Sequence, residues 1–172
     1  KELTEKSEKD PSIQFGKKMI NIEDYLENQH QVATKIAENS IVLLKNEDSI
    51  LPLPVKIEDE SKSFEILYVG EFAAKPHVKG FGSAYVKAFR KTRPLDSSLS
   101  ILEEADSTNV KITYVKGFNT RNWHFVHSKE ESIEKARNAN VVVVFAGTFR
   151  LQEIENKDRN TMSLPSEENE MI

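Results

Sequence analysis

The chain has no cysteine, a single tryptophan and no long hydrophobic run in its 172 residues. The absence of cysteine excludes disulfides, thiolate nucleophiles and thiolate metal sites, and it leaves the redox compartment open. No apolar segment approaches the ~18 residues that a membrane-spanning helix requires, so we expect no membrane partner. Acceptor sequons for N-glycosylation are missing as well.

A strong excess of either charge is also lacking, because the formal net charge is -4 and both signs are interspersed along the chain. Nucleic acid is therefore not an expected partner, since its phosphates require a basic stripe. Gly80 and Gly82 lie about ten residues beyond the nearest expected strand and open no helix, so they do not form a dinucleotide fingerprint. His124 and His127 have no well-placed third metal ligand. We expect neither a cofactor nor a metal.

The chain is expected to form a short linker followed by one domain. Residues 1–29 begin with a stretch rich in Lys, Glu and Ser, which is typical of a linker or of a strap over another surface. Residues 30–172 are long enough to bury a sizeable core. Apolar residues recur at helical spacing from Val32 to Leu44 and predict an amphipathic helix that ends near Lys45 and Asn46.

Three strands are expected, over residues 65–69, 111–115 and 141–146, each followed closely by a glycine. Two helices are expected between them. One begins at Pro94 with Leu95, Leu99 and Leu102 on one face, and the other begins at a capping box of Ser128 and Glu131. Repeated β-α-β units with right-handed crossovers give a parallel sheet, so the three glycine-ended loops should share one edge.

The most informative segment is the last strand and the acidic loop that follows it. The run of β-branched residues from Val141 predicts a central strand covered on both faces. Beyond it come Glu153, Glu155, Asp158 and Arg159. Ligands of open α/β sheets bind outside the carboxyl ends of the strands, so carboxylate chemistry at this edge is the first hypothesis.

The end of the chain indicates that something is missing. Ser166, Glu167 and Glu168 have the capping and charge of a helix N-terminus, yet few residues follow. The predicted helices supply little cover beyond one face of the sheet. We therefore expect the chain to be part of a longer protein or half of an assembly.

Four blocks of sequence carry a resemblance to a known family. They are Glu38 to Glu47 with Ile50 to Leu53, Tyr68 to Ala73, Gly80 to Ala84, and Val141 to Gly147 followed by the acidic loop ending at Leu164-Pro165. In order and spacing they resemble the second domain of family 3 glycoside hydrolases, the β-glucosidase family. The resemblance implies an α/β fold, a three-layer sandwich with a mainly parallel sheet, of which residues 30–172 would be the N-terminal part.

The resemblance also implies a site. Glu155 matches the glutamate of the family's Glu-Gly-x-Asp-Arg motif and would be the general acid/base of a retaining hydrolase. An aspartate nucleophile would come from a (β/α)8 barrel or partner chain outside this sequence, and the substrate would be a β-glucoside or oligosaccharide. The isolated chain would then be inactive.

The remaining candidates have supporting roles. Glu153 is a candidate sugar contact, and Trp123 could stack on a sugar ring at the sheet edge. Asp158 and Arg159 would fix the loop, and Gly82 would make a tight turn. Asn156 stands where the motif has glycine, although asparagine tolerates a left-handed backbone. A non-catalytic carbohydrate-binding or interaction module is the alternative reading.

Overall fold

The computed structural model describes residues 12–15, 18–78, 82–117, 129–148, 152, 155–156 and 159–172. The chain divides into two compact units, Lys1–Leu51 and Pro52–Ile172. The first unit contains an antiparallel pair of strands, β1 (Ser12–Phe15) and β2 (Lys18–Asn21), then helix α2 (Ile22–Ser40) and a short 3-10 helix η1 (Glu47–Ser49). None of the helices in these ranges is both long and apolar enough to cross a bilayer.

Helix α2 begins and ends earlier than predicted. It starts at Ile22 because the side chain of Asn21 caps it, accepting hydrogen bonds from the backbone N–H groups of Glu23 and Asp24 at 2.9 and 3.4 Å. These two acidic residues lie in the first turn, where the helix dipole favours negative charge. This Asn-x-Glu-Asp sequence lies upstream of the apolar periodicity on which the predicted bounds depend.

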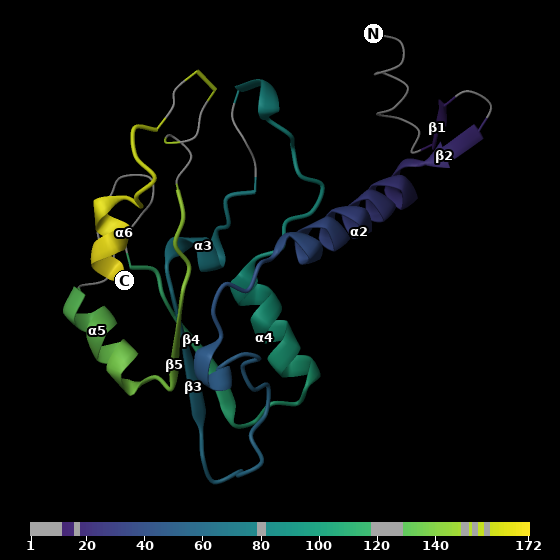
Figure 1. Cartoon of the computed structure of the whole chain (residues 1–172). Coiled ribbons are helices and arrows are strands. Elements are labelled where there is room, and N and C mark those ends of the chain that lie inside the picture. Colours follow the sequence, from purple (N-terminus) through teal and green to yellow (C-terminus); the bar gives the residue numbers. More distant parts are fainter. Residues whose placement is uncertain are drawn as a thin grey trace. The chain divides into compact units, whose positions relative to one another are not determined.

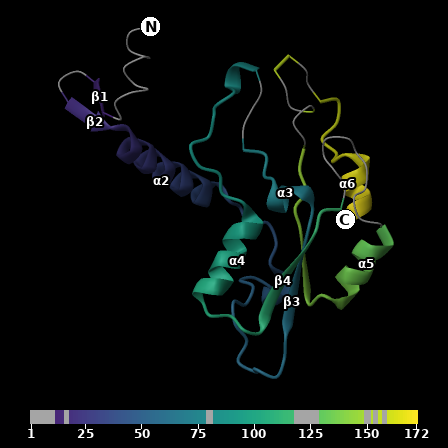
Figure 2. The ribbon, with the colours of Figure 1, turned by 180° about the vertical axis from the view of Figure 1, so that it is seen from behind.

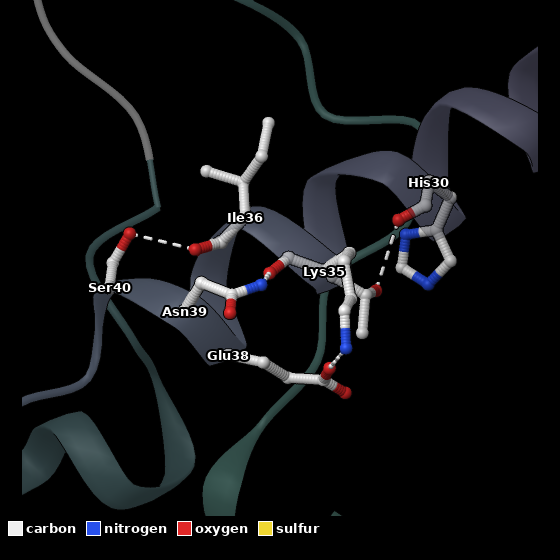
Figure 3. A network of polar contacts seen from close by, with 7 residues as sticks. His30, Lys35, Ile36, Glu38, Asn39 and Ser40 are labelled. Carbon is white, nitrogen blue, oxygen red and sulfur yellow. Dashed lines mark hydrogen bonds and ion pairs between the residues drawn. The ribbon is translucent and has the colours of Figure 1, made fainter.

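Near the C-terminal end of α2, two side chains bond back to carbonyl groups of the helix (Figure 3). Asn39 donates to the carbonyl of Lys35 and Ser40 to the carbonyl of Ile36, both at 2.7 Å. Ile41 is already extended, with φ -76° and ψ 126°. The apolar run that follows therefore lies outside the helix, contrary to the prediction.

The second unit contains the predicted parallel sheet. Its strands are β3 (Phe64–Val69), β4 (Val110–Val115) and β5 (Val141–Val144), and both pairings are parallel. Its helices are α3 (Glu71–Ala74), the 3-10 helix η2 (Gly82–Ala84), α4 (Pro94–Glu104), α5 (Lys129–Asn138) and α6 (Ser166–Met171). The three predicted strands and the helix starting at Pro94 are confirmed. The capping residue Ser128 lies outside the described residues.

The valine-rich strand β5 is not the central strand. The order is β4-β3-β5, so β3 is central and β5 pairs with β3 alone among the described strands. Its burial alternates, and Val142 and Val144 are 39% and 38% exposed. A run of β-branched residues fits a half-covered strand as well as a buried one, because its position depends on its pairing partners.

Helices cover both faces of the sheet, contrary to the expectation of one. Ile66 and Tyr68 of β3 pack with Leu102 of α4 on one face. Leu67 and Val69 point to the other face, where Ala136 of α5, Ala139 just after α5 and Met171 of α6 pack. This alternation follows from the two-residue period of a strand. Figures 1 and 2 show α4 on one side of the sheet and α5 and α6 on the other. The second unit is therefore a three-layer α/β sandwich.

Candidate active site

The carboxyl ends of the three strands form one edge, and glycines stand there. Gly70 directly follows β3 and has φ +116°. A Cβ atom on Gly70 would collide with the carbonyl oxygen of Phe145, so no other residue fits without a shift. Gly117 follows β4 with φ +70°, and Gly147 follows β5. The prediction of a shared edge is confirmed by the parallel register.

Glu155 lies in a turn of the loop between β5 and α6, and its side chain is exposed. Its Oε2 accepts a 2.6 Å hydrogen bond from the hydroxyl of Ser83 and a longer one, 3.4 Å, from the Ser83 backbone N–H. Ser83 belongs to η2, in the segment that follows β3 and α3. Figures 1 and 2 show η2 beside the loop after β5, beyond the carboxyl ends of the strands. Two loops from neighbouring strands thus meet at Glu155.

Left-handed backbone conformations flank this contact on both loops. Gly82, next to Ser83, has φ +64°, and a Cβ atom there would lie 2.9 Å from Oε2 of Glu155. Asn156, next to Glu155, has φ +66°. Asparagine is among the few residues that adopt this conformation readily. The turn thus has a left-handed residue at the position of the motif glycine.

The hydrogen bonds from Ser83 act on the protonation of Glu155. The hydroxyl and then the backbone N–H of Ser83 lower the pKa of the Glu155 carboxyl below its ordinary value, and partial desolvation opposes them weakly. Both donors favour the ionised form because they bond to a negative oxygen. In this structure Glu155 is therefore a carboxylate at neutral pH.

A second carboxyl, Glu168 of α6, is almost completely buried at the base of the same loop. Its Oε2 accepts a 3.0 Å hydrogen bond from the backbone N–H of Gly147. Burial raises the pKa of Glu168, and the Gly147 N–H offsets part of that rise. The contact closes the loop that carries Glu155, because Gly147 precedes the loop and Glu168 follows it. The sequence predicts only that Glu168 adds negative charge to the first turn of a helix, and it does not predict this burial.

A third carboxyl, Glu71, follows Gly70 and is also buried. It forms ion pairs with Lys116 at 3.1 Å and with the more exposed Lys75 at 3.8 Å. Lys116 comes directly after β4, so this pair joins the ends of the two strands. Burial, and secondarily the charge of Glu71, raise the pKa of the neighbouring Tyr114 hydroxyl. The pair is a buried electrostatic link beneath the loops.

The other predicted site residues are described only in part. Arg159 is half-buried in the segment leading to α6. Glu153, Asp158 and Trp123 lie outside the described residues, as do His124 and His127. Within the described ranges, no group of three or more His, Asp or Glu side chains gathers in a way that would hold a metal ion.

The fold and the site define a three-layer α/β domain with a carboxylate at the ligand-bearing edge of its sheet. Residues 41–172 match the model of the glycosyl hydrolase family 3 C-terminal domain. The chain therefore belongs to glycoside hydrolase family 3, as the resemblance predicted.

Curated relatives agree with this assignment. The chain is 35% identical over 147 residues to thermostable beta-glucosidase B of Acetivibrio thermocellus, covering 83% of this chain and 18% of that protein. It is 31% identical over 156 residues to an exo-alpha-(1->6)-L-arabinopyranosidase of Bifidobacterium breve, covering 87% and 20%. It is 27% identical over 160 residues to probable beta-D-xylosidase 6 of Arabidopsis thaliana, covering 92% and 18%. The chain thus spans about a fifth of the length of these relatives.

Proposed function

We propose that this chain is the acid/base-bearing part of a retaining β-glucosidase-like hydrolase, with Glu155 as the general acid/base. One observation carries the proposal. The exposed Glu155 carboxylate lies in a turn where the loops from β3 and β5 meet, and it accepts a hydrogen bond from Ser83 there. The residue that the family motif singles out is thus at the edge where α/β sheets bind ligands.

The proposed reaction has two steps. Protonated Glu155 first gives its proton to the glycosidic oxygen as the bond from C1 to that oxygen breaks, and a second carboxylate forms a bond to C1. Ionised Glu155 then takes a proton from water as the water oxygen attacks C1 and releases the second carboxylate. The two carboxyl groups of such an enzyme stand about 5 to 5.5 Å apart. A barrel domain or partner chain outside this sequence would supply the second one.

The lowered pKa of Glu155 suits the second step better than the first. In the complete site, a bound sugar would exclude water and the second carboxylate would add a like charge. Both effects raise the pKa of a carboxyl group and favour the acid form. Once the second carboxylate is bonded to C1, its charge is gone and the Ser83 hydrogen bonds again favour the base form. One residue can thereby serve in both steps.

Other residues would support this chemistry in the domain proposed for residues 30–172. Glu153 and Trp123 are the proposed contacts to a β-glucoside or oligosaccharide. Asp158 and Arg159 would hold the loop in place, and Gly82 leaves room for the Glu155 carboxylate. This chain spans only 18% and 20% of two of its relatives. The rest of their length is ample for the barrel that the proposal requires.

The test is Glu155→Ala in the full-length protein. Hydrolysis of glycosides with poor leaving groups should fall by about 10²- to 10⁴-fold, the usual contribution of a general acid. Dinitrophenyl glucoside, whose leaving group needs no proton, should lose far less in its first step. Glu104 is an exposed carboxylate and the last residue of α4, so Glu104→Ala is the matched control. Undiminished hydrolysis in Glu155→Ala would remove Glu155 from the mechanism. Sugar binding without turnover by the unaltered protein would instead favour a non-catalytic module.

A further inference from the structure

We propose that Ser83 is a positioning residue that holds the Glu155 carboxylate in place and favours its base form. This inference rests on the proposed acid/base role of Glu155. Ser83 and Glu155 are 72 positions apart in the sequence, so their 2.6 Å hydrogen bond joins two separate loops rather than neighbours in one turn. The contact therefore constrains where the carboxylate sits relative to the sheet edge.

The geometry around the contact supports a specific role. The hydroxyl and the backbone N–H of Ser83 both point to the same oxygen, Oε2, so one residue holds one oxygen with two donors. Gly82 has no side chain, and a Cβ atom in its place would lie 2.9 Å from that oxygen. A side chain at position 82 would therefore crowd the oxygen that Ser83 holds.

Fixing one oxygen has a chemical consequence. A carboxyl that exchanges a proton with a substrate uses one oxygen at a time. With Oε2 held by Ser83, the other oxygen, Oε1, would be the one that faces the leaving group and later the water. A hydroxyl donor also stabilises the negative form, which is the form needed to activate water. Ser83 acts through Glu155 and does not exchange the proton itself.

A contact of the same kind between Ser61 and Asp59 provides a control. Ser61 donates from its hydroxyl to Oδ1 of Asp59 at 2.6 Å and from its backbone N–H at 3.1 Å. It lies in the turn before β3, at the amino end of the strand and away from the carboxyl edge. Like Glu155, Asp59 has a pKa lowered first by the serine hydroxyl. Ser61→Ala therefore removes a matched hydrogen bond far from the proposed site.

The experiment compares Ser83→Ala, Ser83→Thr and Ser61→Ala in the full-length protein. We measure kcat/KM against pH for a glycoside with a poor leaving group. In Ser83→Ala the alkaline limb of this profile should move to higher pH, because the Glu155 carboxylate loses a donor and its pKa rises. For dinitrophenyl glucoside, with turnover limited by water activation, kcat should fall about fivefold, the effect of one ordinary hydrogen bond. Ser83→Thr keeps the hydroxyl and should restore both values.

The pH profiles of the three variants decide whether Ser83 positions Glu155. Ser61→Ala should keep the wild-type profile. A uniform fall in kcat/KM at every pH in Ser83→Ala, or an unmoved alkaline limb, would overturn the positioning role of Ser83. Ser83→Gly repeats the test if Ser83→Ala does not fold. A failure of the Glu155 assignment is separate, because it shows in Glu155→Ala as undiminished hydrolysis of glycosides with poor leaving groups.

Discussion

Gly70 makes possible the sharp turn that ends the central strand. Its φ of +116° lies in a region that side chains rarely adopt, and its backbone passes close to the carbonyl of Phe145. The backbone N–H of Gly70 also bonds to the carbonyl of Val115 at 3.0 Å, which continues the pairing of β3 with β4. The chain therefore turns sharply at Gly70 while the backbone of Gly70 still pairs with β4.

Gly70→Ala should accordingly destabilise the domain by about 2–4 kcal/mol, the combined cost of an unfavourable backbone conformation and a steric collision. Gly147→Ala is the control, because its Cβ would meet nothing closer than Phe72 at 3.5 Å. Urea unfolding of both variants measures the difference. Equal midpoints for the two variants would contradict the argument from backbone geometry.

Glu168 gives a prediction about pH. Burial raises the folded-state pKa of its carboxyl above the unfolded value of about 4.3. The folded protein then binds this proton more tightly than the unfolded protein does. The contribution to stability is complete below the unfolded pKa and is lost as pH rises through the folded pKa.

Glu168→Gln keeps an acceptor for the Gly147 N–H and removes the titration. Its unfolding temperature, relative to that of the wild type, should therefore improve as pH rises from about 4 to 8. Glu170→Gln, an exposed carboxyl on the same helix, should show no such trend. Parallel curves for wild type and Glu168→Gln would show that burial does not set the proton affinity of this group.

Some residue-level features could be read from the sequence and others could not. Tolerance of Asn156 for a left-handed turn was predictable, because it depends on the residue type alone. The bond between Ser83 and Glu155 was not, since it depends on how two distant loops fold back on the same edge. The burial of Glu168 was not predictable either, because its place in the sequence is that of an ordinary residue in the first turn of a helix.

At the scale of elements, the strands were predictable because β-branched runs followed by glycine are strong local signals. The position of β5 in the sheet was not predictable, because pairing is a property of the assembled sheet. The bounds of α2 failed differently. The apolar periodicity from Val32 to Leu44 predicts a helix that starts and ends too late. The observed helix starts after the cap at Asn21 and ends at Ser40.

Helix α4 shows how far periodicity alone can be trusted. Of the three leucines predicted on one face, Leu102 is buried and Leu95 packs against the core, whereas Leu99 is 44% exposed. The core face instead includes Ser98, whose hydroxyl lies 2.9 Å from the hydroxyl of Tyr68 on β3. The face of α4 that packs on the core is therefore formed by Leu95, Ser98 and Leu102, with Leu99 exposed beside it.

Leu102→Ala should lower the free energy of unfolding by about 2–4 kcal/mol, because it leaves a cavity against Ile66 and Tyr68. Leu99→Ala should cost less than about 1 kcal/mol, as an exposed substitution does. Chemical denaturation of the two variants measures the contrast. A larger loss for Leu99→Ala would mean that the other face of α4 carries the packing.

At the scale of the whole molecule, three carboxyls among the described residues of the second unit lie near the carboxyl edge of the sheet in different environments. Glu71 is buried and paired with lysine, Glu168 is buried beneath a backbone N–H, and Glu155 is exposed and oriented by serine. The two buried groups join chain segments beneath the loops. Of these three described carboxyls only Glu155 is exposed, and the proposed chemistry is assigned to it.

The central claim is that Glu155 exchanges the proton in both steps, and azide rescue tests it most directly. Azide is a nucleophile that needs no general base, so it can replace water once Glu155 is gone. In full-length Glu155→Ala with dinitrophenyl glucoside, added azide should restore turnover and yield the β-glucosyl azide, while Glu104→Ala should not respond. Turnover of Glu155→Ala that is low and unchanged by azide, or as fast as wild type without it, would contradict the account.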